Sequence, residues 1–179
     1  MYQFYRSAMK RFLLFSMLML SIFHFEILNA QQNPPGLGFL GSGTNSVARD
    51  ITADGNIVVG DARDGVVNSQ AFRWTAATGM VGIGLLNPTL PSLGFAASED
   101  GSVVVGAAFN SMGIVEAFRW TANDSMQGLG FLPGDNKSSD AVDVSADGAV
   151  IVGNSIDSIN GGQGFRWTTG TGMVALPAE

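Results

Sequence analysis

The chain of 179 residues carries a formal net charge of −6 and contains no cysteine. The lack of thiols excludes disulfides, thiolate metal sites and cysteine nucleophiles, and the acidic balance argues against nucleic-acid phosphates and anionic membrane surfaces as partners. Charged residues make up only 13% while glycine is frequent at 24 residues, which suits closely packed β-structure.

Residues 1–30 are typical of a secretory signal. Basic residues precede an apolar run at 12–23, and Ala30 offers a small residue for cleavage. The run is shorter than the roughly 18 residues of a membrane span, so cleavage after Ala30 is favoured over an uncleaved anchor. Cleavage would remove His24, the only histidine, and both tyrosines. We therefore expect a linker at 31–35 and an exported protein, which is secreted, periplasmic or at the cell surface.

A repeat domain is predicted over residues 36–179. Its three repeats each open with a short apolar phrase, such as Gly36-Leu37-Gly38-Phe39-Leu40, and a partial closing strand follows at 173–177. The repeats span residues 36–81, 82–127 and 128–174. A period in the mid-forties is typical of β-propeller blades.

Within each repeat the first two strands flank an Asp-Gly turn. In the first repeat these strands are 47–52 and 57–60, and Asp-Gly between apolar runs predicts a tight hairpin, because both positions can adopt a positive φ. The second strand is β-branched throughout and is expected to be buried on both faces, and its final glycine indicates a bulge or a close backbone approach. The turn pairs are Asp54-Gly55, Asp100-Gly101 and Asp147-Gly148.

The third strand contains Phe-Arg-Trp in every repeat, and a fourth strand follows that begins at a methionine. Alternation places the Phe and Trp on one face and the Arg on the other. We interpret the aromatic pairs as a core between neighbouring repeats, because a structural contact recurs in every unit of an array. On this interpretation a tryptophan in the middle repeat matters more than one in the third, half-covered repeat. The pairs are Phe72 and Trp74, Phe118 and Trp120, and Phe165 and Trp167.

These elements predict an all-β fold with three tandem repeats of about four short antiparallel strands each, arranged like β-propeller blades. Closed propellers use about 4–8 blades. Three repeats therefore leave two arrangements, an incomplete or open arc and a ring closed by oligomerisation.

The order of these phrases resembles the HAF extracellular repeats of exported bacterial proteins. The shared phrases are Asp-Gly, Val-Val-Gly, Ala-Phe-Arg-Trp-Thr, Gly-Met-Val and Gly-Leu-Gly-Phe-Leu, over nearly all of residues 36–177. The histidine that names the repeat is replaced by Gln70, Glu116 and Gln163. The resemblance implies an exported, propeller-like repeat protein without a defined activity, substrate or catalytic residue.

Two recurring sets of polar residues could carry chemistry. The turn aspartates could serve a glycosidase or hold calcium, but turn formation explains them better. Arg73, Arg119 and Arg166 could capture an anionic ligand, but recurrence favours pairing with a carboxylate or packing on an aromatic ring. No catalytic residue, cofactor or metal site is expected, since histidine-based triads are excluded after cleavage.

The expected function is a non-enzymatic structural or binding module. Its partner would be an extracellular glycan or protein, or a second copy, and not nucleic acid, and the mature form would have no membrane span. The unequal loops at 61–69, 107–115 and 154–162 would carry specificity. Two alternatives stay open, a carboxylate-based glycan hydrolase and a truncated fragment of a longer repeat protein.

Overall fold

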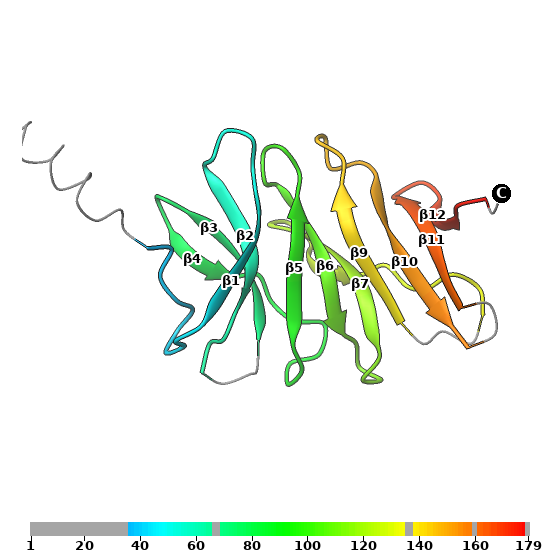
Figure 1. Cartoon of the computed structure of the whole chain (residues 1–179), viewed down its shortest axis with the longest axis horizontal. Coiled ribbons are helices and arrows are strands. Elements are labelled where there is room, and N and C mark those ends of the chain that lie inside the picture. Colours follow the sequence, from blue (N-terminus) through cyan, green and yellow to red (C-terminus); the bar gives the residue numbers. More distant parts are fainter. Residues whose placement is uncertain (1–35, 66–68, 135–137, 159–160, 178–179) are drawn as a thin grey trace, which may run out of the picture. The chain divides into compact units, whose positions relative to one another are not determined.

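The fold is that of a computed structural model, shown in Figure 1, which describes residues 36–65, 69–134, 138–158 and 161–177. The predicted leader, its cleavage after Ala30 and the linker at 31–35 lie outside the described residues. The strands belong to one compact unit, Leu37–Glu179.

Twelve strands are present in the described residues, and they form three antiparallel sheets of four strands in chain order. We call these sheets the first, second and third blade. The first contains β1 (Ser46–Ile51), β2 (Ile57–Ala62), β3 (Gln70–Thr75) and β4 (Gly79–Gly82). The second contains β5 (Ser92–Ala97), β6 (Val103–Phe109), β7 (Val115–Thr121) and β8 (Ser125–Gly128). The third contains β9 (Ser138–Val144), β10 (Ile151–Asp157), β11 (Gly161–Thr168) and β12 (Gly172–Ala175). The predicted all-β, propeller-like fold is confirmed.

The turn between the first two strands of each blade differs from the predicted two-residue hairpin. In the first blade, Gly55 N donates to Thr52 O at 2.8 Å, and Thr52 N donates to Ile57 O at 3.0 Å. Only the glycine uses the positive φ that both positions can adopt, 74° at Gly55. Inside the turn, Asp54 Oδ1 accepts hydrogen bonds from Thr52 Oγ1 at 2.7 Å and from Asn56 N at 3.0 Å.

The glycine at the end of each β-branched run allows two backbones to approach closely. A Cβ on Gly60 or Gly106 would collide with a carbonyl oxygen of the neighbouring first strand, that of Val47 or Leu93. Beside this contact the first strand has a bulge, as between Ala48 and Asp50 in the first blade. The close approach and the bulge therefore occur together, on the two paired strands.

The blades stack with a constant direction. The back face of each blade carries the Phe and Trp of its third strand and packs on what precedes it in the chain. In the second blade, Phe118 shares a cluster with Val59 of the first blade and with Ile83 of the linker between them. In the third blade, Phe165 shares a cluster with Val105 of the second. The forward face, which carries the Arg, therefore meets the next blade.

All three Phe side chains of these pairs are completely buried, whereas the three Trp side chains are partly buried. Trp74 lies in a cluster with Leu37 and Leu40, which belong to the segment before β1. That cluster contains no residue of another sheet. Trp120 and Trp167 lie in clusters that contain residues of the preceding blade. The aromatic faces point backward, so the less covered tryptophan is Trp74, and the expectation that Trp167 is less covered was wrong.

Burial of the second strands confirms this direction. Every residue of β2 is buried, and β6 is buried in all but its last residue. In β10 buried and exposed residues alternate, so the prediction of burial on both faces was wrong for the third blade. No described sheet covers its forward face.

We expect Gly106→Ala to lower the free energy of unfolding by about 2–3 kcal/mol, because the added methyl group overlaps the Leu93 carbonyl oxygen. Gly170→Ala is the matched control, since nothing lies within 4 Å of a Cβ added there. Urea denaturation followed by tryptophan fluorescence measures both. Equal effects of the two substitutions would contradict the close approach.

We expect Trp120→Ala and Trp167→Ala to cost about 3 kcal/mol each in stability, and Trp74→Ala to cost about half as much. The reason is that only the first two leave a cavity between two sheets. Thermal melts of the monomeric chain test the order. If Trp167→Ala proved the mildest of the three, the direction of stacking would be wrong.

Candidate functional site

The recurring aspartates sit inside the turns between the first two strands. Asp100 Oδ1 accepts hydrogen bonds from Ser98 Oγ at 2.8 Å and from Ser102 N at 2.9 Å. Ser98 Oγ in turn accepts from Val103 N at 3.0 Å, which closes the loop. The first and third blades repeat this network with Thr52 and Ser145 as the hydroxyl residues.

These hydrogen bonds favour the ionised carboxylate. The Ser102 backbone N–H, followed by the Ser102 and Ser98 side chains, lowers the pKa of Asp100 to about 2. The Asn56 backbone N–H and the Thr52 hydroxyl lower the pKa of Asp54, and the Ser145 hydroxyl and the Ala149 backbone N–H lower that of Asp147. The turn therefore accounts for the presence of one such aspartate at the same position in every repeat.

A second set of hydroxyls joins neighbouring blades and was missed in the sequence. Ser92 Oγ accepts from Ala71 N of the preceding blade at 3.0 Å and donates to Gly84 O at 2.8 Å. Ser139 makes the same two bonds, with Ala117 N and with Gly130 O. Both serines are completely buried. Their recurrence at the start of the first strand was the available signal.

The arginines of the third strands reach toward the next blade. Arg73 Nε donates to Gly101 O in the second blade at 2.9 Å. Arg119 Nη1 lies 3.7 Å from Asp124 Oδ2, and its buried Nε has no partner among the described residues. Both line an open cleft of about 580 Å³ together with Asp100 and Asp147. Arg166 is exposed, because no described blade follows it.

The loops expected to carry specificity are shorter than predicted. Part of each predicted range belongs to strands; in the second blade, β6 extends to Phe109 and β7 starts at Val115. In this second-blade loop Asn110 Oδ1 accepts from Met112 N and Ile114 N, which ties the loop down. Such a short, internally bonded loop offers few side chains that could determine binding specificity.

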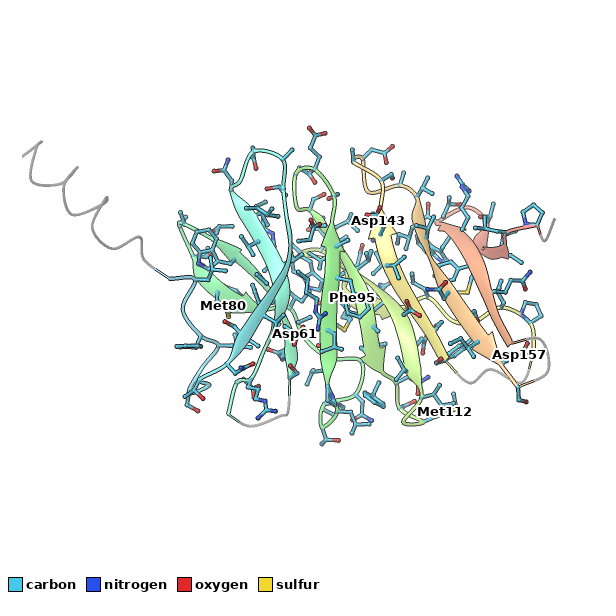
Figure 2. All side chains as sticks on the ribbon, in the orientation of Figure 1. Asp61, Met80, Phe95, Met112, Asp143 and Asp157 are labelled. Carbon is cyan, nitrogen blue, oxygen red and sulfur yellow. The ribbon has the colours of Figure 1, made fainter. Side chains whose placement is uncertain are left out.

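A surface on the first strands combines regular placement with unequal side chains. Each first strand has one unpaired bulge residue, namely Arg49 in β1, Phe95 in β5 and Val142 in β9. These residues line an open cavity of about 530 Å³ with Val47 and Ala48. Figure 2 shows Phe95 on β5, between β1 and β9. We call these five residues the first-strand surface.

Arg49 is held firmly in this surface. Its Nε donates to Asp61 Oδ1 at 2.6 Å, and its guanidinium carbon lies 5.2 Å from the centre of the Phe95 ring. The Arg49 side chain is 37% exposed, whereas that of Asp61 is 9% exposed and also accepts from Ser69 Oγ at 3.1 Å. The guanidinium thus presents a fixed positive edge beside an aromatic ring and two exposed valines, Val47 and Val142. This arrangement can take an apolar group that carries a carboxylate.

No group of three or more potential metal-ligating side chains comes together in the part of the chain that the structure describes. Within the same residues, no helix has the length and hydropathy to cross a membrane.

Comparison with known proteins bears on the fold. No family model matches the sequence, and no curated protein matches it. Among solved structures, the chain is similar to a putative TolB from Agrobacterium tumefaciens, at 17% identity and a TM-score of 0.59, over 79% of this chain and 50% of that one. It is also similar to TolB from Acinetobacter baumannii, at 17% identity and a TM-score of 0.51, over 75% of this chain and 32% of that one. The chain thus spans half or less of their length, and the likeness is one of fold.

We expect the stability of the protein to fall as the pH drops from about 4 to about 2. The pKa of Asp100 is about 2 in the folded state, below the roughly 3.9 of an unfolded aspartate, so its stabilising contribution is complete above the unfolded value and is lost on protonation. Asp54 and Asp147 act in the same direction. Thermal melts at several pH values measure the loss, and Asp100→Asn should make it shallower. An unchanged slope in that variant would contradict the turn assignment.

Proposed function

We propose that the protein is an exported, non-enzymatic binding module that takes its partner on the first-strand surface. The observation that carries this proposal is the contrast between positions that repeat and positions that do not. The Asp and Gly positions recur because they hold the turns, and the Phe and Ser positions recur because they join neighbouring blades. The three bulge positions repeat in geometry but differ in chemistry, as Arg49, Phe95 and Val142.

The partner chemistry follows from the side chains of this surface. Val47 is 42% and Val142 45% exposed, and both lie in the same open cavity as the Arg49–Phe95 pair. Arginine and aromatic residues are enriched at protein interfaces, and here the pair lies beside two exposed valines. We infer that the ligand is an extracellular peptide or protein segment with an apolar side chain next to a carboxylate, rather than a neutral glycan.

Export is part of this proposal. It is supported by the basic and apolar segments of residues 1–30 and by the resemblance to HAF repeats over residues 36–177. The compartment would be the periplasm, the cell surface or the medium. The propeller-like fold of three blades is compatible with such a module, because this architecture presents the ends and edges of many strands to partners.

The alternative of a glycan hydrolase is less well supported. A carboxyl group that acts as general acid needs a raised pKa. The turn hydrogen bonds lower the pKa of Asp54, Asp100 and Asp147 instead. These three carboxylates are therefore suited to holding their turns and not to donating a proton.

A peptide and glycan array probed with the purified protein tests the function. We expect acidic–apolar peptides to bind, and Phe95→Ala and Arg49→Ala each to weaken binding by about tenfold or more. Val81→Ala is the matched control, because Val81 is 48% exposed on β4, outside the first-strand surface. Cleavage of a glycan, or binding unaffected by Phe95→Ala, would contradict the proposal.

A further inference from the structure

The forward face of the third blade lacks the cover that the other two blades have. Val59 and Val105 occupy the same position in β2 and β6 and are completely buried against the next blade. Val152 occupies this position in β10 and is 37% exposed, and Ile156 on the same face is 41% exposed. The surface is thus built like an internal interface.

The back face of the first blade is open in a complementary way. Val144 in the third blade is 8% exposed and packs in the cluster shared with the second blade. Ile51 occupies the corresponding position in the first blade and is 57% exposed. It borders a mostly apolar groove of about 320 Å³, whose other lining residues include Leu37 and Val58. The segment before β1 packs on this back face through Leu37, but no preceding sheet packs there.

Polar groups at these two faces also match in register. Ser92 and Ser139 each bridge to the preceding blade, and Ser46 stands at the same repeat position in the first blade. The backbone N–H that such a serine would meet in the third blade is that of Gly164, which faces Asn154 as Ala71 faces Asp61.

The arginines give a second polar match. Arg73 donates to the carbonyl oxygen of Gly101 in the next blade. Arg166 is the corresponding side chain of the third blade and is exposed. The carbonyl group in the corresponding turn of a first blade is that of Gly55. One chain thus carries both halves of its own blade-to-blade interface.

We propose that a second copy of this chain docks the back face of its first blade on the forward face of the third blade, and that the reciprocal contact closes a ring of two copies. The contact continues the internal interfaces, with Val152 and Arg166 against Ile51, Ser46 and Gly55 of the partner subunit. Propellers close with about 4–8 blades, and six is the only multiple of three in that range. A head-to-tail contact that closes on itself also avoids an open filament.

At each junction of the ring, Leu176 of one chain and Leu37 of the other could fill the same position between two blades. Leu176 N donates to Gly164 O at 2.9 Å, as Ile83 N donates to Ala71 O, so Leu176 stands where a linker begins. Leu37 already lies in the linker position on the first blade. In the proposed dimer Leu37 stays in this position, and Leu176, which is 45% exposed in the single chain, lies outside the interface. Leu176→Ser should therefore leave the dissociation constant within about twofold of the original, unlike the interface substitutions.

Size-exclusion chromatography with light scattering tests the association. The sample is the protein purified from cells with its N-terminus as the cells process it. We expect twice the mass of one chain. Val152→Asp and, separately, Ile51→Lys should each give monomers and raise the dissociation constant at least about a hundredfold, because each buries a charge at both junctions. Both side chains are exposed in the single chain, so its circular dichroism should not change. Met112→Asp is the control, at a 71% exposed loop position away from these faces.

Mixing the two monomeric variants distinguishes this arrangement from others. A ring with one Val152→Asp chain and one Ile51→Lys chain contains one undamaged junction, and its other junction brings opposite charges together. The mixture should therefore form dimers although neither variant does so alone. Ile156→Asp replaces Val152→Asp if the latter misfolds.

Four results would overturn the proposal. The first two are a wild-type protein that is monomeric at all concentrations and a dimer that survives Val152→Asp. The third is a dimer that Val152→Asp breaks but Ile51→Lys leaves intact, which indicates a face-to-face contact between two third blades. The fourth is a mixture of the two variants that does not form dimers.

Discussion

The burial of one phenylalanine per repeat against the residues that precede its blade is the contact on which the rest of the structure depends. Phe118 and Phe165 are completely enclosed, each by residues of two sheets. Burying an aromatic side chain of this size contributes on the order of 2–3 kcal/mol. A single four-stranded sheet has no second layer of its own, so Phe118 and Phe165 need the preceding blade, whereas the cluster of Phe72 is completed by Leu37 and Leu40 of the segment before β1.

Close contact within and between the sheets requires small residues and internal polar partners. Gly60, Gly106 and Gly153 leave no room for a side chain beside the first strand of their own sheet. Ser92 and Ser139 satisfy backbone groups that the sheet hydrogen bonds do not reach. An unpaired buried N–H group costs about 1–3 kcal/mol, so these hydroxyls are as necessary to the stack as the apolar residues.

The recurring features of the sequence predicted the local structure of each repeat well. They predicted less well how each blade contacts its neighbours. Alternation in Phe-Arg-Trp correctly separated the aromatic and arginine faces, because side-chain direction in a strand is a local property. Which neighbour each face meets depends on the stacking direction, so the less covered tryptophan was assigned to Trp167 instead of Trp74. The first-strand surface escaped prediction because Arg49, Phe95 and Val142 share no chemistry, and only the bulges bring them to one surface.

The backward orientation of the aromatic faces also sets an order of folding. Each sheet finds its covering surface in residues that are already synthesised, since Phe118 needs Val59 and Ile83, and Phe165 needs Val105. A chain that leaves the ribosome or a translocation channel from its N-terminus can therefore add blades one at a time. No aromatic face waits for a segment that has yet to emerge, and the exposure that leads unfinished chains to aggregate is limited to the newest forward face.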